Sequence, residues 1–564
     1  MLSFLPEPYH HNYRDTLLFG YSSGMVLIAL LVLFFFTKRE ESSSVGHAGW
    51  RLKGWRDFIP YPSMLLLAGL VFLIVQSFFG HYAPFMATGD EYCRMDYAFW
   101  WSQEPFFSTP DHIWLPGQFY IFGALFWIIP DLEVISTAFS IMGTLLVCLG
   151  CTNLAALLVP NKIAAVFAGL LASVHWMVLW ASTSAMAEVF FYPSLLLTAN
   201  AWVAAFALSS DLDENKRINL QDQFLFCAAI ANGFGNMFRY ESWYFGIPLG
   251  CFFLVRLAMR CGKGEFTPVS RLLYPFASAF VIALYPVAHA ISSWVGLGSP
   301  LAFFTTHTEM NAQTNLFYGE QTLFEKLWNY PHILWEDHWY LLPLSLLGIA
   351  LSLGKSERRS SLFYHVGLWL VFVFAMLISV KSGIGSNTRP RFTTFFVLLM
   401  GVFSAYPLAL IFRTAVGWWR VPVAILGLLL LLLHGNASLF KGIQQYPNAY
   451  AVHSNDAALI MRLKLESGID RQWKYPPMIH PQDWDLCVFA QGDGVTMWPF
   501  RYHSWQPERV YFLWSEESLY TLARERVSNR SFVLRKPFPG DLNLEEHYNL
   551  SLEMPDWQVW HSKQ

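Results

Sequence analysis

The strongest constraint on the fold is a series of apolar stretches, each long enough to cross a lipid bilayer. A helix needs about 20 apolar residues to span a hydrocarbon core of ~30 Å. Apolar residues fill 54% of the 564 positions and charged residues only 14%, unlike a soluble protein. The candidate spans are residues 17–36, 60–80, 134–158, 162–181, 186–208, 221–237, 242–257, 272–294, 338–353, 362–380, 392–412 and 418–433. The sequence therefore predicts an α-helical polytopic membrane protein with about 12 transmembrane helices.

A further apolar stretch, residues 115–130, is short, bounded by prolines and rich in aromatic residues. It either spans the membrane or lies on its surface. Lysine and arginine decide between the two, because they concentrate in short cytoplasmic loops. If the stretch is interfacial, the cationic loops 38–56 and 256–271 fall on the same side of the membrane, and if it spans they fall on opposite sides. We therefore expect an interfacial segment.

This topology divides the chain into a transmembrane domain, residues 1–435, and a soluble domain, residues 436–564, on the periplasmic or luminal side. The first outer loop, residues 81–133, is expected to carry interfacial helices. The soluble tail has strand-like runs at 486–490, 509–513 and 531–534 and a helical stretch at 455–464, which predict a small α/β domain. A net charge of −3 and the lack of a Gly-rich phosphate loop give no support for nucleic-acid or nucleotide binding.

The first outer loop opens with an acidic pair, Asp90 and Glu91, shortly after a predicted span. Charge at that position is costly unless it faces water or a polar cavity, so the pair is a candidate functional site. The alternative is that Asp90 only caps an interfacial helix. Helical spacing places Asp90, Arg94 and Tyr97 on one face, within reach of lipid headgroups.

A second outer loop carries three cations, Lys381, Arg389 and Arg391, against the positive-inside trend. The planar guanidinium fork holds phosphate oxygens in pairs, so phosphate recognition is one natural use of this loop. Anchoring to anionic lipid headgroups is the other use.

Further charged residues fall on the same outer side. Arg239 lies beside Glu241 in a turn between two spans, Glu188 opens a span, and Asp96 follows the acidic pair in the first loop. Each is either part of a structural ion pair or a contributor to a site. The acids are candidates for acceptor binding, or for holding a divalent cation bridged by Asp90, Glu91 and Glu188, because carboxylate oxygens suit hard cations.

Acids near lipid headgroups and cations that can hold phosphate suit group transfer from a polyprenyl-phosphate sugar. A carboxylate takes the proton of an acceptor hydroxyl as a general base. Preorganised arginines stabilise the charge that develops on the leaving lipid phosphate. This scheme requires no metal, although a divalent cation is compatible with it.

The order of these features resembles the integral-membrane glycosyltransferases of the GT-C fold, especially the aminoarabinose transferases that act on lipid A and the protein O-mannosyltransferases. Asp90-Glu91 is similar to the acidic pair at the head of that family's first outer loop, and Leu115-Pro116 to its Pro-led interfacial segment. Glu188 corresponds loosely to an acid that opens a later span. The cationic loop 381–391 and the outer tail also look like family features.

The resemblance implies an inverting hexosyl or pentosyl transferase that uses a polyprenyl-phosphate or dolichyl-phosphate sugar. Asp90 would be the catalytic base, assisted by Glu91. Arg239, Lys381, Arg389 and Arg391 would bind the donor phosphate. The acceptor would be the hydroxyl of a lipid, a glycan or a protein at the membrane surface.

Two matters stay open at the level of sequence. A transporter or flippase of a lipid-linked sugar would also place acids and arginines on the outer face, but transporter sites typically lie at broken helices near the bilayer midplane. The bacterial inner membrane and the endoplasmic reticulum are both compatible with the chain, with a slight preference for the bacterial membrane.

Overall fold

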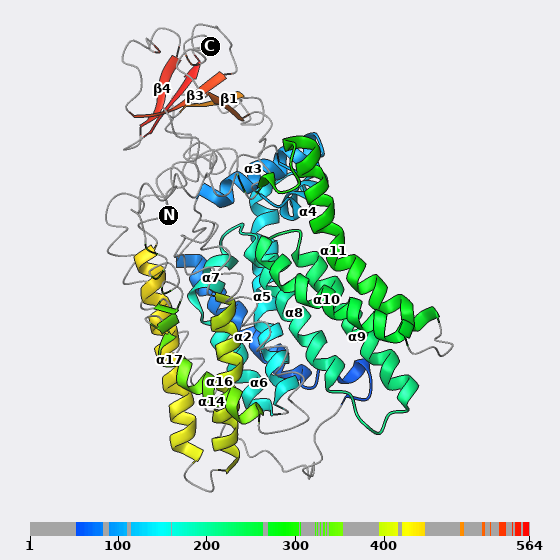
Figure 1. Cartoon of the computed structure of the whole chain (residues 1–564). Coiled ribbons are helices and arrows are strands. Elements are labelled where there is room, and N and C mark those ends of the chain that lie inside the picture. The colour runs from blue at the N-terminus through cyan, green and yellow to red at the C-terminus, as the bar shows by residue number, and fades with distance from the viewer. Residues whose placement is uncertain are drawn as a thin grey trace.

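The computed structural model describes most of the transmembrane region and parts of the tail. The described ranges are residues 52–82, 89–109, 114–159, 161–262, 269–303, 338–353, 394–414, 420–445, 485–489, 510–513, 530–536, 548–553 and 557–562, with single residues between some of them. The α-helices are α2 (Pro62–Tyr82), α3 (Gly89–Gln103), α4 (Gly117–Phe126), α5 (Leu132–Leu158), α6 (Lys162–Ser173), α7 (Trp176–Ser182), α8 (Glu188–Phe206), α9 (Glu214–Gly235), α10 (Tyr240–Gly262), α11 (Val269–Leu297), α14 (Leu342–Leu353), α16 (Thr394–Thr414) and α17 (Arg420–Gln445). Figure 1 shows a helical bundle with α3 and α4 at one end, where the C-terminal strands also lie.

Six described helical segments are long and apolar enough to cross a membrane, and the bent pair α6–α7 adds a seventh if it counts as one span. The six are Trp55–Ser77, Leu132–Leu158, Glu188–Phe206, Tyr240–Gly262, Arg271–Leu297 and Thr394–Ile411, and each overlaps a predicted span. The chain is therefore a multi-pass membrane protein.

The other predicted spans have different outcomes. Stretches 221–237, 338–353 and 418–433 are largely helical, as α9, α14 and α17, but these helices do not meet the same length and hydropathy limits within the described residues. Stretches 17–36 and 362–380 lie outside the described residues. The total of about 12 spans therefore stays a prediction.

The predicted span 162–181 is broken in the structure. α6 and α7 meet at an angle of 62°. His175 sits at the break and caps α7, because its Nδ1 accepts the backbone N–H of Met177 at 3.2 Å. The His175 ring also lies 5.4 Å, centroid to centroid, from the rings of His338 and His434. The bend lies at this buried polar cap. One polar residue changes the mean hydropathy of the segment very little, and hydropathy alone therefore predicted one continuous helix.

The stretch that was ambiguous in the sequence does not span. α4 has 10 residues and α3 has 15, which correspond to roughly 15 Å and 22 Å of helix at 1.5 Å per residue. Both are shorter than a hydrocarbon core of ~30 Å. The two helices pack against each other, and the lengths confirm that residues 115–130 form a non-spanning segment.

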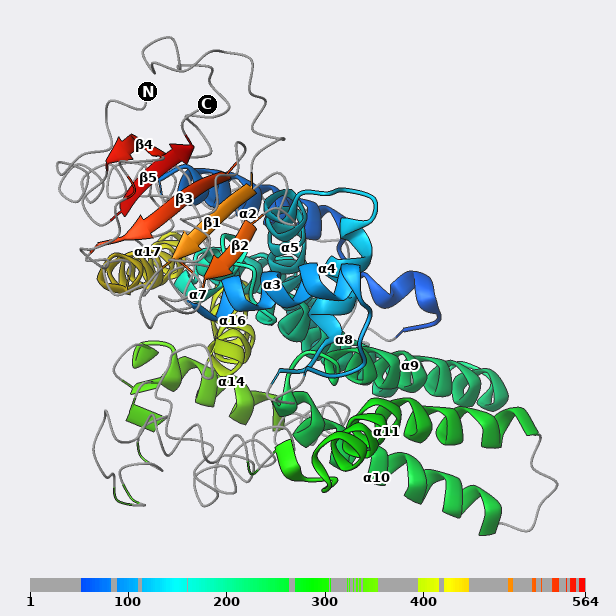
Figure 2. The same cartoon turned by 90° about the horizontal axis from the view of Figure 1, so that it is seen from above.

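Three long helices form an arm on one side of the bundle. α9 packs against α8, α11 packs against α9, and α10 packs against α11. Figure 2 shows these three helices projecting away from the strands and from α2 and α5. The arm matters for the site because Arg239 lies between its helices α9 and α10, and Glu241 lies in the first turn of α10.

Close packing of α5 against α8 helps to set the position of the first turn of α8. A Cβ atom added to Gly143 of α5 would lie only 2.1 Å from the backbone oxygen of Val189. Val189 is the second residue of α8 and follows Glu188 directly. Only a glycine lets the two backbones approach this closely, so Gly143 helps to position Glu188.

We expect Gly143→Ala to destabilise the protein, because the Cβ would meet backbone and force α5 and α8 apart. Such overpacking costs about 1–3 kcal/mol, which should appear as a lower melting temperature in detergent. Gly250→Ala in α10 is the matched control. Its nearest neighbouring atom would be 4.0 Å away, and alanine is the better helix former. Equal melting temperatures for Gly143→Ala and the wild type would contradict the packing argument.

The described strands of the tail form one sheet. They are β1 (Asp485–Phe489), β2 (Val510–Leu513), β3 (Arg530–Arg535), β4 (Tyr548–Glu553) and β5 (Trp557–Ser562), in the order β2-β1-β3-β5-β4. β1 is parallel to β2 and β3, and β5 is antiparallel to β3 and β4. The first three strands confirm the predicted runs, whereas β4 and β5 were not predicted. The helical stretch 455–464 lies outside the described residues, so the α/β character of the tail stays a prediction.

Candidate functional site

Three of the predicted polar residues, Glu188, Arg239 and Glu241, form a buried ionic cluster. Arg239 Nη1 donates to Glu188 Oε1 at 2.7 Å. Its Nη2 and Nε donate to the two oxygens of Glu241 at 2.5 Å and 3.1 Å, which is the paired geometry of a guanidinium fork on a carboxylate. The side chains of Glu188 and Arg239 are only 1% and 11% exposed. The structure brings Arg239, which the sequence analysis assigned to the same outer side as Glu188 and Glu241, into contact with both of them.

Helix ends bring the three residues together. Glu188 is the first residue of α8, and Glu241 lies in the first turn of α10. Carboxylates are favoured at both positions because the N-terminal end of a helix carries partial positive charge. Arg239 lies between α9 and α10, where the chain reverses, so its side chain reaches both carboxylates.

Among the described residues, the cluster joins one guanidinium to two carboxyl groups. Burial by itself lowers the pKa of Arg239, but Glu188 and then Glu241 more than offset that effect, and the net result is a raised pKa. Arg239 therefore stays cationic, and its positive charge is already matched before any anion arrives.

Glu188 has unused hydrogen-bonding capacity. Its Oε1 accepts from Arg239, whereas its Oε2 is buried and has no hydrogen-bond partner among the described residues. An unmatched buried carboxylate oxygen is costly, because water has been removed without replacement. It is therefore a natural acceptor for a hydroxyl group from a bound molecule.

The cluster continues to the start of α16. Tyr192 lies one turn after Glu188 on α8, and a hydrogen bond joins its side chain to that of Thr394, the first residue of α16. Thr394 is only three positions after Arg391 in the sequence. Lys381, Arg389 and Arg391 themselves lie outside the described residues.

A chain of polar contacts links α3 to the same region. Arg94 of α3, 5% exposed, lies over the Trp114 ring at 4.2 Å, and its Nη1 donates to Gln118 Oε1 of α4 at 3.4 Å. Gln118 Nε2 in turn donates to the backbone oxygen of Ala185 at 2.5 Å. Ala185 is three residues before Glu188, so α3, α4 and the start of α8 form one continuous structure.

The backbone of α4 is also joined to the turn that carries Arg239. The Gly117 N–H donates to the Met237 oxygen at 2.9 Å. A Cβ on Gly117 would lie 2.7 Å from that same oxygen, so the close approach requires glycine here. The Leu115-Pro116-Gly117 segment therefore also helps to position the turn that carries Arg239.

The acidic pair begins α3. Asp90 is the second residue of this helix, so it does not occupy the N-cap position that the alternative reading required. Glu91 is completely buried and Asp96, further along α3, is half-buried. The structure thus places Glu91 and Asp96 on the helix that carries Arg94. Glu188 and Glu241 are each in direct contact with Arg239.

Sequence reasoning missed Tyr192 and Gln118 as members of this region. Gln118 could have been identified from the sequence, because it is a polar residue in an apolar stretch and a buried amide needs a hydrogen-bond partner. Tyr192 had no comparable signal, because tyrosine is common inside apolar helices near a membrane surface.

The described residues also allow a test for a metal ion. Among them, no group of three or more histidine, cysteine, aspartate or glutamate side chains is placed to hold one. Glu188 and Glu241 both face Arg239, which competes with a cation for their oxygens. The divalent-cation hypothesis, which involves Asp90, therefore stays a prediction.

No protein-family model matches the sequence, and no curated protein matches it. Among solved structures, the chain is similar to the oligosaccharyltransferase of Archaeoglobus fulgidus, a GT-C fold glycosyltransferase, at low identity over most of its length. For the apo crystal structure the TM-score is 0.46 with 14% identity, covering 90% of this chain and 75% of that one. For that organism's AglB with an inhibitory peptide and a dolichol-phosphate, the values are 0.44, 14%, 86% and 70%.

A third structure of the Archaeoglobus fulgidus enzyme, a complex with Zn and sulfate, has a TM-score of 0.42 at 14% identity and covers 88% of this chain and 73% of that one. All three scores are below 0.5.

Proposed function

We propose that this protein is a membrane glycosyltransferase that moves a sugar from a polyprenyl-phosphate donor to an acceptor hydroxyl at the outer face of the membrane. The observation that carries the proposal is the buried Glu188–Arg239–Glu241 cluster at the ends of two spans, linked to the non-spanning helices α3 and α4. Buried charge at a membrane boundary is a functional-site hypothesis by default. A lipid-linked donor meets a polar acceptor at this depth.

Asp90 is the proposed general base and Glu91 its positioning partner. The acceptor oxygen forms a new bond to the anomeric carbon while the bond from that carbon to the phosphate oxygen breaks. The hydroxyl proton passes to Asp90, and the lipid phosphate leaves with the electron pair of the broken bond. Direct displacement inverts the anomeric centre. What supports this role is the position of Asp90 in the first turn of α3, the helix that Arg94 and Gln118 connect to the backbone of Ala185, three residues before Glu188.

Lys381, Arg389, Arg391 and Arg239 are the proposed donor-phosphate ligands. The contact between Thr394 and Tyr192 supports a role for the 381–391 loop, because the residues just after that loop adjoin the cluster. Arg239 is already matched by two carboxylates. Its first contribution is therefore to hold those carboxylates, and the loop cations supply most of the positive charge for the phosphate.

Glu188, Glu241 and Asp96 are the proposed acceptor-side or cation-binding residues. The buried Oε2 of Glu188, which lacks a partner among the described residues, supports a hydrogen bond to an acceptor or sugar hydroxyl. The acceptor is a lipid, a glycan or a protein. The strands of the tail, which Figure 1 shows at the same end as α3 and α4, are proposed to assist in acceptor recognition.

The proposed location of the site is the periplasmic or luminal side, in the bacterial inner membrane or the endoplasmic reticulum. The support is the distribution of lysine and arginine, which concentrate in the loops assigned to the cytoplasm.

One observation favours a second candidate function, transport or flipping of a lipid-linked sugar. Broken helices are typical of transporter sites, and the α6–α7 pair is bent by 62° next to three buried histidines. These histidines are His175, His338 and His434. In the transporter hypothesis they would line part of the path.

Purified protein in detergent should consume one member of a panel of radiolabelled polyprenyl-phosphate sugars when a membrane extract supplies acceptors. Transfer of label to an acceptor, with release of the lipid phosphate, is the expected result. The same donors are offered to sealed vesicles that contain the protein. Translocation without consumption of any donor would overturn the transferase and support the transporter.

A further inference from the structure

The chain at and just before the start of α8 holds two buried side-chain oxygens that have no hydrogen-bond partner among the described residues. They are the hydroxyl oxygen of Ser184, four positions before Glu188, and Oε2 of Glu188 itself. Both residues are at most 1% exposed, so bulk solvent does not satisfy either atom. A buried polar atom without a partner is costly and needs an explanation. A bound molecule is one explanation that fits both atoms.

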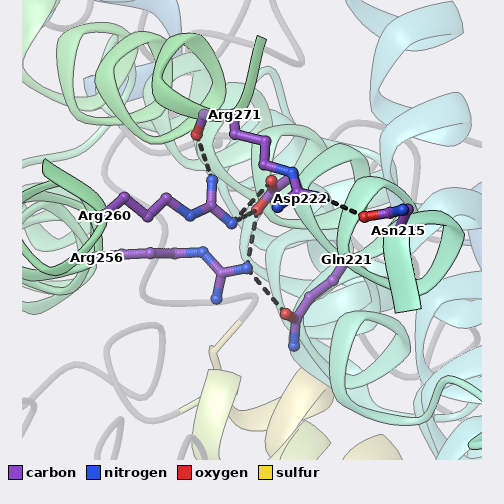
Figure 3. Close-up of polar contacts among 6 residues, drawn as sticks. All are labelled: Asn215, Gln221, Asp222, Arg256, Arg260 and Arg271. Atoms are coloured by element: carbon purple, nitrogen blue, oxygen red, sulfur yellow. Dashed lines mark hydrogen bonds and ion pairs between the residues drawn. The ribbon is translucent and has the colours of Figure 1, made fainter. Parts of the chain in front are cut away.

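A buried carboxylate elsewhere in the molecule offers a comparison. In the arm, Arg256 donates to Oδ1 of the buried Asp222 at 2.9 Å, and Arg260 Nη2 lies 2.9 Å from each oxygen of Asp222. Figure 3 shows both guanidiniums reaching this carboxylate. The fold therefore matches both oxygens of Asp222 with its own side chains, whereas among the described residues it matches only one oxygen of Glu188. The open oxygen of Glu188 is thus not shared by every buried acid of this protein.

The segment between α7 and α8 is fixed through its backbone and not through the Ser184 side chain. Ser140 Oγ of α5 donates to the Ser184 backbone oxygen at 2.7 Å, and Gln118 Nε2 of α4 donates to that of Ala185 at 2.5 Å. The Met186 N–H also donates to the Ser184 backbone oxygen, at 2.9 Å. These contacts hold the segment in place and leave the Ser184 hydroxyl available. A hydroxyl held in one place in this way suits the recognition of a ligand.

The first turn of α8 also lacks a side-chain cap. Its N-cap residue is Ala187, which has no side-chain oxygen to accept a backbone N–H. Serine, threonine, aspartate and asparagine are the usual residues at this position because they supply that oxygen. The partial positive charge at the start of a helix attracts an electronegative atom. An oxygen of a bound molecule is therefore favoured next to Ser184 and Glu188.

These groups suit a neutral hydroxyl and not a phosphate. A hydroxyl group accepts hydrogen bonds and donates one. It can therefore accept from Ser184 and donate to the Glu188 carboxylate at the same time. An ionised phosphate oxygen has no proton to donate to a carboxylate, and the two negative charges repel each other. In a lipid-linked sugar the hydroxyl groups belong to the sugar, so the sugar is the part of the donor that fits this position.

Exposure increases along the cluster away from Glu188. The side chains of Glu188, Arg239 and Glu241 are 1%, 11% and 25% exposed. The cluster is thus open to its surroundings at Glu241 and closed at Glu188. A sugar that enters past Glu241 reaches the open oxygen of Glu188 at the inner end, where a hydrogen bond is stronger because water is excluded.

We propose that Ser184 and Glu188 bind one hydroxyl group of the sugar on the polyprenyl-phosphate donor. This inference rests on the proposed glycosyltransferase function and assigns Ser184 to it as a sugar-binding residue. The sugar hydroxyl accepts from Ser184 Oγ and donates to Glu188 Oε2. The pair selects the sugar by the position of that hydroxyl, because a site built to hydrogen-bond a hydroxyl rejects an analogue that lacks it.

Donor binding without transfer is the first measurement. Purified wild-type protein in detergent, with no acceptor present, is titrated with the panel of radiolabelled polyprenyl-phosphate sugars and with the polyprenyl phosphate alone. The sugar that binds most tightly is then compared with its analogues in which one hydroxyl is replaced by hydrogen. We expect one deoxy analogue to bind at least about tenfold more weakly than the parent sugar, because it loses a hydrogen bond to a charged group.

Ser184→Ala should bind the parent sugar about fivefold more weakly than the wild type does, which is the usual size of the effect for one hydrogen bond between uncharged groups. It should bind that deoxy analogue and the bare polyprenyl phosphate with wild-type affinity, because neither carries the hydroxyl. An equal loss of affinity for all ligands would overturn the contact and leave Ser184 with a structural role.

Ser136→Ala is the matched control. Ser136 of α5 is equally buried, but its Oγ donates to the Glu133 backbone oxygen of its own helix at 3.1 Å. Wild-type affinity for every ligand is expected. The same selective loss of affinity in this variant would overturn the assignment of Ser184.

Three outcomes on the wild type separate this inference from the function on which it rests. Equal affinity for the parent sugar and all deoxy analogues would overturn the hydroxyl contact and leave the transferase proposal standing. Binding of no polyprenyl-phosphate sugar would overturn both. Loss of sugar binding on addition of EDTA, restored by a divalent cation, would overturn the direct contact to Glu188 in favour of a bound cation. These measurements need no variant, so the test stands even if Ser184→Ala does not fold.

Discussion

Replacing Asp90 with asparagine should abolish sugar transfer while the protein still folds. Asparagine has nearly the same shape but cannot take a proton from the acceptor hydroxyl. A positioned general base contributes about 10²-fold to 10⁴-fold to a rate, so the loss should be at least about a hundredfold. The measurement is the initial rate of label transfer from the donor that the wild type consumes, at saturating donor and acceptor. The melting temperature in detergent should stay that of the wild type.

The control for this prediction is Asp211→Asn. Asp211 is exposed, just before α9, and therefore far along the arm from Arg239. This variant loses the same charge but should transfer sugar at the wild-type rate. If Asp90→Asn kept more than half of the wild-type rate, Asp90 would not be the base, and Glu91 or Glu188 would have to be tested in its place.

Replacing Arg239 with methionine should strongly destabilise the fold. Methionine fills a similar volume but leaves Glu188, which is 1% exposed, without its cation. Removing one partner of a buried ion pair typically costs about 3–5 kcal/mol of folding free energy, because the remaining buried charge has neither hydration nor an opposite charge to stabilise it. Chemical unfolding in detergent, followed by tryptophan fluorescence, measures the change. Transfer should fall as well, since Arg239 holds both carboxylates.

A second substitution separates the charge effect from simple loss of packing. In the double variant Glu188→Gln/Arg239→Met, no buried charge is left at position 188, so much of the lost stability should return. Glu241→Gln should cost less than Arg239→Met, because the Glu241 side chain is 25% exposed and keeps some water. If the double variant were as unstable as Arg239→Met alone, the Glu188–Arg239 contact would not be the cause.

The contribution of Arg239 to stability should not depend on pH in the usual working range. In the folded protein, Glu188 and Glu241 raise the pKa of Arg239 above the ordinary value of an arginine. A cation with a raised folded-state pKa stabilises the fold fully below the unfolded-state pKa and loses that effect only above it. Any change in stability between pH 5 and 9 must therefore come from other groups.

Much of the helical architecture was predictable, because a bilayer demands long apolar segments whatever their partners are. The six spans that pass the length and hydropathy limits all overlap predicted ones. The same reasoning missed the break at His175, because a bend made by a buried polar cap changes the hydropathy of the segment very little. It also missed strands β4 and β5, whose short polar-rich runs acquire strand character through pairing with β3 and with each other.

The candidate site was predictable only as a set of residues on one side of the membrane. Glu188, Arg239 and Glu241 stood out because charge is rare in such a chain, and the structure places all three in contact. The geometry of their contacts could not be predicted from the sequence. The fork of Arg239 on Glu241, the unmatched oxygen of Glu188 and the contact of Tyr192 with Thr394 join residues up to 202 positions apart in the chain.

The sequence by itself determined that this chain crosses a membrane several times. Long apolar segments indicate membrane spans whichever residues they later contact. The sequence also determined that residues 115–130 do not span, through the balance of lysine and arginine between the loops. Only the tertiary structure decided which charges are matched. A carboxylate and a guanidinium neutralise one another only within a few ångströms. That distance is set by helix ends from distant parts of the chain, which close packing at Gly117 and Gly143 brings together.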